Sequence, residues 1–185
     1  MPDTINPSVS IADRSFNIEA LQNKSLLLRI APQGIAVLIA DPGKERYIFF
    51  ENYPNENDDL AETLRNIEKV VEKHPWLSTL SCKVLFVNHK ATFIPFSLFD
   101  ENEQRNYLSF NVDIEGEEEV MANKISTLRA YCIFAIPGRL AYLLSEKFNN
   151  PEVHHYSGVT TESLLLNKSF KTRDRILHIG VKRNM

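Results

Sequence analysis

The chain has 185 residues, of which 43% are hydrophobic and 24% charged, and its formal net charge is −3. These values are typical of a globular chain with one domain or two small ones. Its 21 basic residues are outnumbered by 24 acidic ones. Since nucleic-acid binding needs a basic face, we expect no nucleic-acid partner.

The sequence carries no signal for a membrane. No apolar run approaches the ~20 residues that span a bilayer. The first segment, MPDTINPSVSIADRSF, lacks the basic region and apolar core of a signal peptide, so we expect no membrane insertion. Cys82 and Cys132 each lie in an apolar run, which favours buried free thiols over a disulfide. A cytoplasmic location is the expectation that follows.

The first half of the chain begins with a polar segment and continues with strands. Residues 1–23 contain turn formers, so we expect a flexible arm, with an early strand over 15–18 as an alternative. The apolar runs 26–31 and 35–41 fit strands buried on both faces. The aromatic run 46–51 predicts a third strand. Because short turns join these three strands, they form an antiparallel meander.

A helical period follows the meander. Apolar residues recur as on one face of a helix, at Leu60, Leu64, Ile67, Val70 and Val71. Asp59 and Glu62 have the spacing of a capping box, and Pro75 ends the pattern. The sequence therefore predicts a helix that begins after Asp59 and stops before Pro75.

Strands and short helices alternate through the middle of the chain. Residues 82–88 and 91–95 read as strands, and Asp100 caps a short helix over 101–109. The acidic run 115–119 predicts a solvated turn, with cation binding as the alternative. The flanking strands of that turn are expected at 110–114 and 120–125.

The last third predicts further strand–helix units. Residues 129–136 form a strand, and Pro137 occupies the first position of a helix that runs to about Asn149. A strand over 153–157 and a helix to Leu166, with Thr161 as N-cap, follow. A final strand is expected over 175–181. A meander followed by alternating helices and strands predicts a mixed sheet with right-handed crossovers.

Several stretches resemble one known family. They are LLLRIAPQGIAVLIADP, KVLFVNHKATFIPFSLFD, NEQRNYLSFN, MANKI and IPGRLAYLLSEKFNNPEVHHYSGVTTESLL. Together they are similar to an uncharacterised family from Bacteroidetes, domain of unknown function 3822, which has an actin-like ATPase fold. The resemblance covers about residues 24–181. It implies an α/β fold, an actin-like (ribonuclease H-like) mixed sheet with a three-strand antiparallel meander and helices packed on it.

The resemblance also implies a division of the chain. The actin-like fold has two similar halves with nucleotide between them. Residues 24–168 correspond to the first lobe, after the flexible arm of residues 1–23. RILHIGVKRNM resembles the opening strand of the second half, so residues 169–185 would be a linker and the start of an incomplete second lobe. The chain is then truncated relative to the two-lobed fold, or another molecule supplies the second half.

Phosphate loops are where nucleotide-binding members of the fold hold ATP. Their first hairpin typically carries Asp-x-Gly, in which the carboxylate organises Mg²⁺ and the glycine lets the backbone approach phosphate. Here the stretch RIAPQGI has no carboxylate, and Pro32 removes a backbone donor. Gln33 and Gly34 remain at this position, and Gly180 marks the second loop, again without Asp. These three are degenerate cofactor-binding candidates, and an ordinary hairpin turn is the alternative.

Other residue groups offer weaker candidates. Tyr47, Phe49, Tyr53 and Trp76 suggest a partner-binding patch, with core filling as the alternative. His154 and His155 are neighbours on a strand, so they point to opposite faces and do not share a metal ion. A catalytic pair of a cysteine with His89 has no supporting motif. We therefore expect no catalytic and no metal-binding residues.

The sequence leads to one functional hypothesis and one alternative. The intact fold pattern with degraded phosphate loops favours a non-catalytic protein-interaction module without a cofactor, which binds an unidentified protein or forms a homodimer. The alternative is a nucleotide-binding protein or ATPase that holds ATP and Mg²⁺ at an atypical site.

Overall fold

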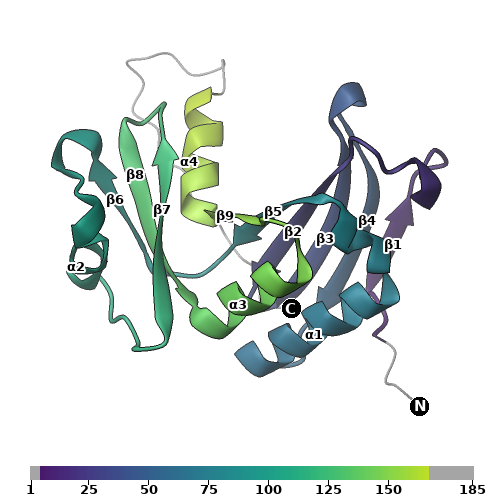
Figure 1. Cartoon of the computed structure of the whole chain (residues 1–185), viewed down its shortest axis with the longest axis horizontal. Coiled ribbons are helices and arrows are strands. Elements are labelled where there is room, and N and C mark those ends of the chain that lie inside the picture. The colour runs from purple at the N-terminus through teal and green to yellow at the C-terminus, as the bar shows by residue number, and fades with distance from the viewer. Residues whose placement is uncertain (1–4, 167–185) are drawn as a thin grey trace.

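Two β-sheets form the framework of the protein in a computed structural model, which describes residues 5–166 (Figure 1). The larger sheet has six strands in the order β1-β4-β3-β2-β5-β9. In chain order these are β1 (Val9–Ala12), β2 (Ser25–Ala31), β3 (Gly34–Asp41), β4 (Arg46–Pro54), β5 (Ser81–Phe86) and β9 (Glu152–His155). The smaller sheet has the order β6-β8-β7, with β6 (Ala91–Pro95), β7 (Glu118–Ile125) and β8 (Ala130–Pro137).

The centre of the larger sheet is mixed. β2, β3 and β4 are antiparallel neighbours, and β5 and β9 extend the sheet in parallel with β2. Leu28 pairs with Val37 on β3 and with Val84 on β5, and all three side chains are buried. The predicted meander and the predicted mixed sheet are both confirmed.

An additional strand lies at the edge of this sheet. β1 pairs antiparallel with β4, with Ile11 opposite Phe50, so part of the segment expected as an arm is a strand. The alternative strand over 15–18 is wrong, because the Asp13 carboxylate accepts hydrogen bonds from the backbone N–H and hydroxyl of Ser15 and holds a turn there. All four residues of β1 are exposed, so the strand is held by its pairing with β4 at the sheet edge and not by a buried face.

Helix α1 (Leu60–Lys73) begins and ends close to the predicted positions. The Asp59 side chain accepts a hydrogen bond from the backbone N–H of Ala61 at 3.1 Å, so it is the N-cap. The predicted capping box is wrong in its second half, because the Glu62 carboxylate accepts instead from two backbone N–H groups of the loop before the helix. The helix stops before Pro75, which opens a short 3-10 helix.

Two helices cover one face of the larger sheet. Figure 1 shows α1 and α3 (Gly138–Lys147) side by side in front of the strands. They enclose the main core, which contains Leu26, Ile30, Val37, Ile39, Ile67, Val70, Val84, Leu140 and Leu144. Pro137 is the N-cap of α3 and not its first helical residue.

The smaller sheet has its own covering helix. α2 (Gln104–Ser109) follows a 3-10 turn that Asp100 caps, and it packs on the side of β8 that faces away from the larger sheet (Figure 1). Alternate residues of β8 therefore belong to two cores: Phe134 joins the main core, while Ile133 packs with Leu108 of α2. The strand expected at 110–114 is absent, since the chain there runs irregularly into β7.

Three polar side chains join the two sheets. The Asn88 amide donates to the Ala135 carbonyl, and the Asn123 amide donates to the Val153 carbonyl, both at 2.9 Å. His155 lies between them: its Nε2 is 3.0 Å from Asn88 Oδ1, and its Nδ1 accepts from the Ser157 N–H. Burial lowers the pKa of His155 to about 4, so the ring is neutral and Nε2 carries the proton.

The described part of the chain ends in helix α4 (Tyr156–Leu166). This helix begins five residues before the predicted N-cap Thr161, and Gly158 brings it close to the smaller sheet, because an added Cβ would lie 3.3 Å from Cys132 Cβ. The strand predicted at 175–181 lies outside the described residues. Between residues 5 and 166, no helix has the length and apolar content needed to cross a membrane.

Candidate functional site

The β2–β3 hairpin contains Gln33 and Gly34, which the sequence analysis names as degenerate phosphate-loop candidates. Only Pro32 and Gln33 separate the paired residues Ala31 and Gly34. Gly34 has φ +128°, and a Cβ there would lie 2.2 Å from the Tyr53 carbonyl oxygen. Glycine is therefore required here by the close approach of β4, whether or not a ligand is present.

Asn55 holds the turn of this hairpin through both its backbone N–H and its side-chain amide. The Gln33 carbonyl accepts a hydrogen bond from the Asn55 N–H at 3.0 Å, and the Pro32 carbonyl accepts from the Asn55 amide at 2.9 Å. The side-chain amide of Asn55 also donates to the Thr63 hydroxyl in α1. Since Pro32 has no N–H, the turn presents carbonyls to Asn55 and lacks the series of donors that cradles a phosphate.

A cleft of about 390 Å³ opens beside this turn. It lies at the carboxyl ends of the parallel strands β2 and β5, where open α/β sheets bind their ligands. Ile30 and Phe86 form part of its wall, with the start of α1 on one side and the loop before β7 on the other. By position, this cleft is the candidate ligand site.

The charges around the cleft are mainly negative. Four carboxylates line it, on Asp58, Asp59, Glu115 and Glu118, against the single ammonium group of Lys90. Lys90 Nζ lies 2.8 Å from a Glu118 oxygen and 3.6 Å from one of Glu115. The hydrogen bond to Glu118 raises the pKa of Lys90. The one cation of the cleft is thus already neutralised.

The acidic run 115–119 differs from the predicted solvated turn. Glu115 is exposed, but Glu118 lies in β7 with a side chain that is only 10% exposed, because it pairs with Lys90. Within residues 5–166, no group of three or more histidine, cysteine or acidic side chains has the arrangement of a metal site.

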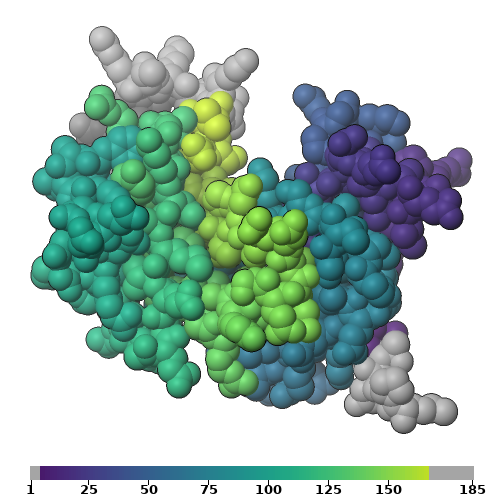
Figure 2. Space-filling view, viewed as in Figure 1, coloured from purple at the N-terminus to yellow at the C-terminus, as the bar shows by residue number. Residues whose placement is uncertain are grey.

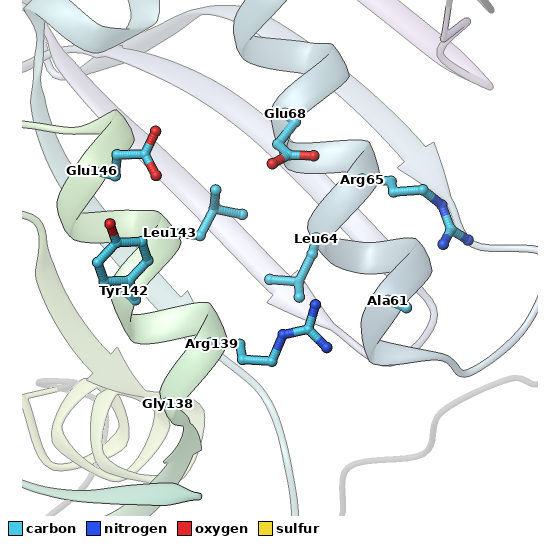
Figure 3. Close-up of a pocket in the computed structure, with 9 residues that line it drawn as sticks. All are labelled: Ala61, Leu64, Arg65, Glu68, Gly138, Arg139, Tyr142, Leu143 and Glu146. Atoms are coloured by element: carbon cyan, nitrogen blue, oxygen red, sulfur yellow. The ribbon is translucent and has the colours of Figure 1, made fainter.

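A larger groove of about 530 Å³ separates α1 from α3 (Figure 3). Leu64 and Leu143 form its buried floor. Along its rim Figure 3 shows Arg139 near the start of α3 and Glu146 near the end, with Tyr142 between them. The Tyr142 side chain is 69% exposed. An apolar floor, an exposed tyrosine and a charged rim are features that recur in protein-binding surfaces.

The four aromatic residues proposed as a partner-binding patch do not share a surface. Tyr47 is 64% exposed, but Phe49 and Tyr53 are buried. Phe49 and Trp76 pack edge to face, with ring centroids 5.6 Å apart, and Phe16 stacks on Phe49. Core filling therefore accounts for Phe49 and Tyr53, and a binding role for Tyr47 stays a prediction.

A buried polar cluster was missed by the sequence analysis. The Tyr53 hydroxyl donates to Glu51, whose carboxylate also lies 2.7 Å from His74 Nε2 and 3.5 Å from Lys73 Nζ. The Ser10 hydroxyl of β1 adds a further hydrogen bond at 3.0 Å. The only sequence signal is Glu51 two residues before Tyr53 on one face of β4, since the other partners lie far away in the sequence.

The cluster fixes the ionisation of its members. Burial raises the pKa of Glu51, but hydrogen bonds from Tyr53, His74 and Ser10 outweigh it and hold that pKa below its ordinary value. Burial and the neighbouring Glu51 raise the pKa of Tyr53. The carboxylate is thus ionised and the phenol neutral at pH 7. Glu51 is 5% exposed and Tyr53 is fully buried, so the position of the cluster suits a structural role.

The remaining candidates are distributed over the molecule. Cys82 and Cys132 are free and buried, and burial raises their pKa values to about 12 and about 11. They lie on different sheets. As predicted for neighbours on a strand, His155 is buried while His154 is part-exposed. Gly180 lies outside the described residues.

Comparison with solved structures shows the fold. A Bacteroides thetaiotaomicron protein described as having an actin-like ATPase fold and unknown function matches with a TM-score of 0.74 at 18% sequence identity. The match covers 80% of this chain and 58% of that one, so the chain spans little more than half of its structural relative. The cytoplasmic domain of EpsL, from the type II secretion system of Vibrio cholerae, gives a TM-score of 0.43 at 13% identity, covering 70% and 54%.

Comparison at the level of sequence identifies the family. No curated protein matches the chain. Residues 13–184 match the family described as protein of unknown function (DUF3822), which is the family that the sequence stretches quoted above resemble. The actin-like fold and the family are thus both confirmed, and the chain belongs to the DUF3822 family.

Proposed function

We propose that this chain is a protein-binding module on an actin-like fold that does not hydrolyse ATP. The observation that carries the proposal is the β2–β3 turn. Its carbonyls are hydrogen-bonded to Asn55, Pro32 supplies no N–H, and no carboxylate stands at the position that organises Mg²⁺. A turn of this kind stabilises a hairpin and does not bind a triphosphate.

The electrostatics of the neighbouring cleft support the same proposal. A nucleoside triphosphate is strongly anionic and would enter a cleft lined by four carboxylates and one lysine that already pairs with Glu118. Like charges at close range in a partly buried site are unfavourable. The cleft is therefore poorly suited to a phosphate chain.

The groove between α1 and α3 supplies the binding surface in this proposal. Its floor is apolar, its rim is charged, and the Tyr142 side chain beside it is 69% exposed. Replacement Tyr142→Ala should weaken partner binding without unfolding the protein, because an exposed side chain contributes little to stability.

A thermal-shift experiment tests the claim about ATP. A ligand at 100 times its dissociation constant stabilises a protein by ~2.7 kcal/mol, which moves the melting temperature by several degrees. We expect no shift with ATP·Mg²⁺ at millimolar concentration, and none with ADP·Mg²⁺ compared with Mg²⁺ alone. A saturable upward shift with nucleotide would contradict the proposal.

A nucleotide-binding function is the second candidate, and one observation favours it. The cleft lies at the carboxyl ends of β2 and β5, beside the start of α1 and next to Lys90, which is where α/β sheets hold ligands. If nucleotide binds there, Lys90 must leave Glu118 and contact phosphate. The replacement Lys90→Gln would then abolish a nucleotide-dependent shift, whereas in the lead proposal there is no shift to abolish.

A further inference from the structure

We propose that the groove between α1 and α3 binds a second copy of this chain, with the two α3 helices antiparallel across a two-fold axis. This inference rests on the proposed function, because it names the partner of the same groove. The inference is carried by the order of the charges along α3. When two copies of the helix lie antiparallel, the basic end of each faces the acidic end of the other.

The exposed face of α3 carries three residues at helical spacing. Arg139, Tyr142 and Glu146 are three and four residues apart, so they lie along one face of the helix. Arg139 is in the first turn and Glu146 in the last, about 10 Å apart along the axis. Figure 3 shows them in the order Arg139, Tyr142, Glu146 along α3, with Tyr142 and Glu146 over the helix and the Arg139 side chain extending toward α1.

A two-fold axis across the helix satisfies both charges at once. It places Arg139 of each copy opposite Glu146 of the other, and it brings the two Tyr142 side chains together near the axis. A parallel arrangement would instead place Arg139 against Arg139. Two-fold interfaces use the same patch on both copies, so a patch with opposite charges at equal distances from its centre specifies the antiparallel arrangement.

Two charges of α3 are placed against the helix dipole, while Lys147 in the last turn is placed with it. A cation at the start of a helix and an anion at its end are both unfavourable, and Arg139 and Glu146 occupy these two positions. Within residues 5–166, Arg139 has no ion-pair partner, and Glu146, whose side chain is half exposed, pairs with its part-buried neighbour Lys147 at 2.9 Å. An antiparallel second copy gives Arg139 the opposite charge that it lacks within these residues, and it adds a second cation beside Glu146.

The size of the surface predicts a weak dimer. The 14 residues of α1 and the 10 of α3 span about 21 Å and about 15 Å. Two helices of this length present less than the ~800 Å² per partner of a standard interface. We therefore expect dissociation in the micromolar range, and the oligomeric state must be measured at several concentrations up to hundreds of micromolar.

Charge reversal gives a test that depends on the geometry. The variant Arg139→Glu carries two acidic ends, and Glu146→Arg carries two basic ends. Each alone should be monomeric by sedimentation velocity and light scattering, with a dissociation constant raised about tenfold or more, since two ion pairs become two like-charge contacts. An equimolar mixture of the two variants should form a dimer of twice 21.2 kDa. The double variant Arg139→Glu with Glu146→Arg should dimerise as the native protein does.

Matched reversals elsewhere on the surface serve as controls. Arg14 and Glu101 are exposed and, within residues 5–166, form no ion pair. The variants Arg14→Glu and Glu101→Arg should leave the dimer unchanged, and circular dichroism should show that all variants are folded. A native protein that stays monomeric at every concentration, or a mixture that fails to dimerise, overturns the inference.

The same samples separate this inference from the proposed function. A monomer with no ATP·Mg²⁺ shift overturns the second copy as the partner and leaves the protein-binding proposal standing. A clear shift with ATP·Mg²⁺ overturns the proposed function, whatever the oligomeric state.

Discussion

At the scale of single residues, Gly34 shows how a residue typical of phosphate loops can have a structural role. Its φ of +128° and the 2.2 Å separation between an added Cβ and the Tyr53 carbonyl exclude any side chain. The replacement Gly34→Ala should lower the free energy of unfolding by about 2–4 kcal/mol, because backbone strain and a backbone clash act together. Urea denaturation monitored by circular dichroism measures this loss.

Gly116 provides the matched control for that substitution. No atom lies within 4 Å of a Cβ added there, so Gly116→Ala should change the free energy of unfolding by less than about 0.5 kcal/mol. Equal effects of the two replacements would show that the approach of β4 to the hairpin does not constrain Gly34.

The buried carboxylate of Glu51 predicts a dependence of stability on pH. Its pKa in the folded state lies below the ordinary value of 4.5. The ionised group therefore stabilises the fold fully above pH 4.5, and this contribution is lost as the pH falls below 4.5 through the folded-state pKa. The variant Glu51→Gln should be less stable at pH 7 by about 1–3 kcal/mol, since it loses the ion pair with Lys73 and weakens the hydrogen bond with His74.

The same variant should also respond less to acid. Between pH 7 and pH 3, its midpoint in urea should fall less than that of the native protein, because the titrating group is gone. Glu101→Gln, at an exposed carboxylate, should keep the native pH dependence. If Glu51→Gln and the native protein lose stability in parallel, the buried cluster does not contribute to acid sensitivity.

At the scale of secondary structure, the start of α1 depends on one side chain. Asp59 accepts from the Ala61 N–H at 3.1 Å, so Asp59→Ala should cost about 1 kcal/mol of stability through the lost N-cap. The neighbouring Asp58 is exposed and makes no cap. Asp58→Ala should be within about 0.5 kcal/mol of the native protein, and an equal loss in both variants would contradict the role of Asp59.

Elements with a strong local pattern were predictable from the sequence. The strands β2 to β6 and β8, and both ends of α1, follow from apolar period, caps and prolines that lie within the element itself. β1 was missed because its four exposed residues pair only at a sheet edge. The strand expected at 110–114 failed for the opposite reason: Val112 and Ile114 are apolar, but they pack around α2 and not in a ladder.

Contacts between residues that are far apart in the chain could not be predicted from the sequence. The sequence predicts that Glu118 belongs to a solvated turn, because no pattern in its neighbouring residues shows that Lys90 lies beside it in the fold. Likewise Glu51 meets His74 only after α1 has packed on the sheet. The hairpin of Gly34 was recognised, but only the structure shows that Asn55 binds its turn.

At the scale of the whole molecule, the chain combines two sheets in an actin-like fold. Asn88, Asn123 and His155 join the sheets through side-chain hydrogen bonds, and the cleft beside Lys90 lies next to this junction. The position of the cleft is that of a ligand site, and our proposal is that its acidic lining and the Asn55-bound turn beside it do not accept a triphosphate. The groove lies between α1 and α3, whose surfaces, blue and green, lie next to each other in Figure 2.

The most direct test of this account is calorimetric titration of the chain with ATP·Mg²⁺. Heat of binding reports occupancy itself and does not depend on a change in stability. The account predicts no saturable heat at nucleotide concentrations up to the millimolar range, with the native protein and Lys90→Gln alike. Saturable binding that the native protein shows and Lys90→Gln loses would contradict it, and would establish the cleft as a nucleotide site.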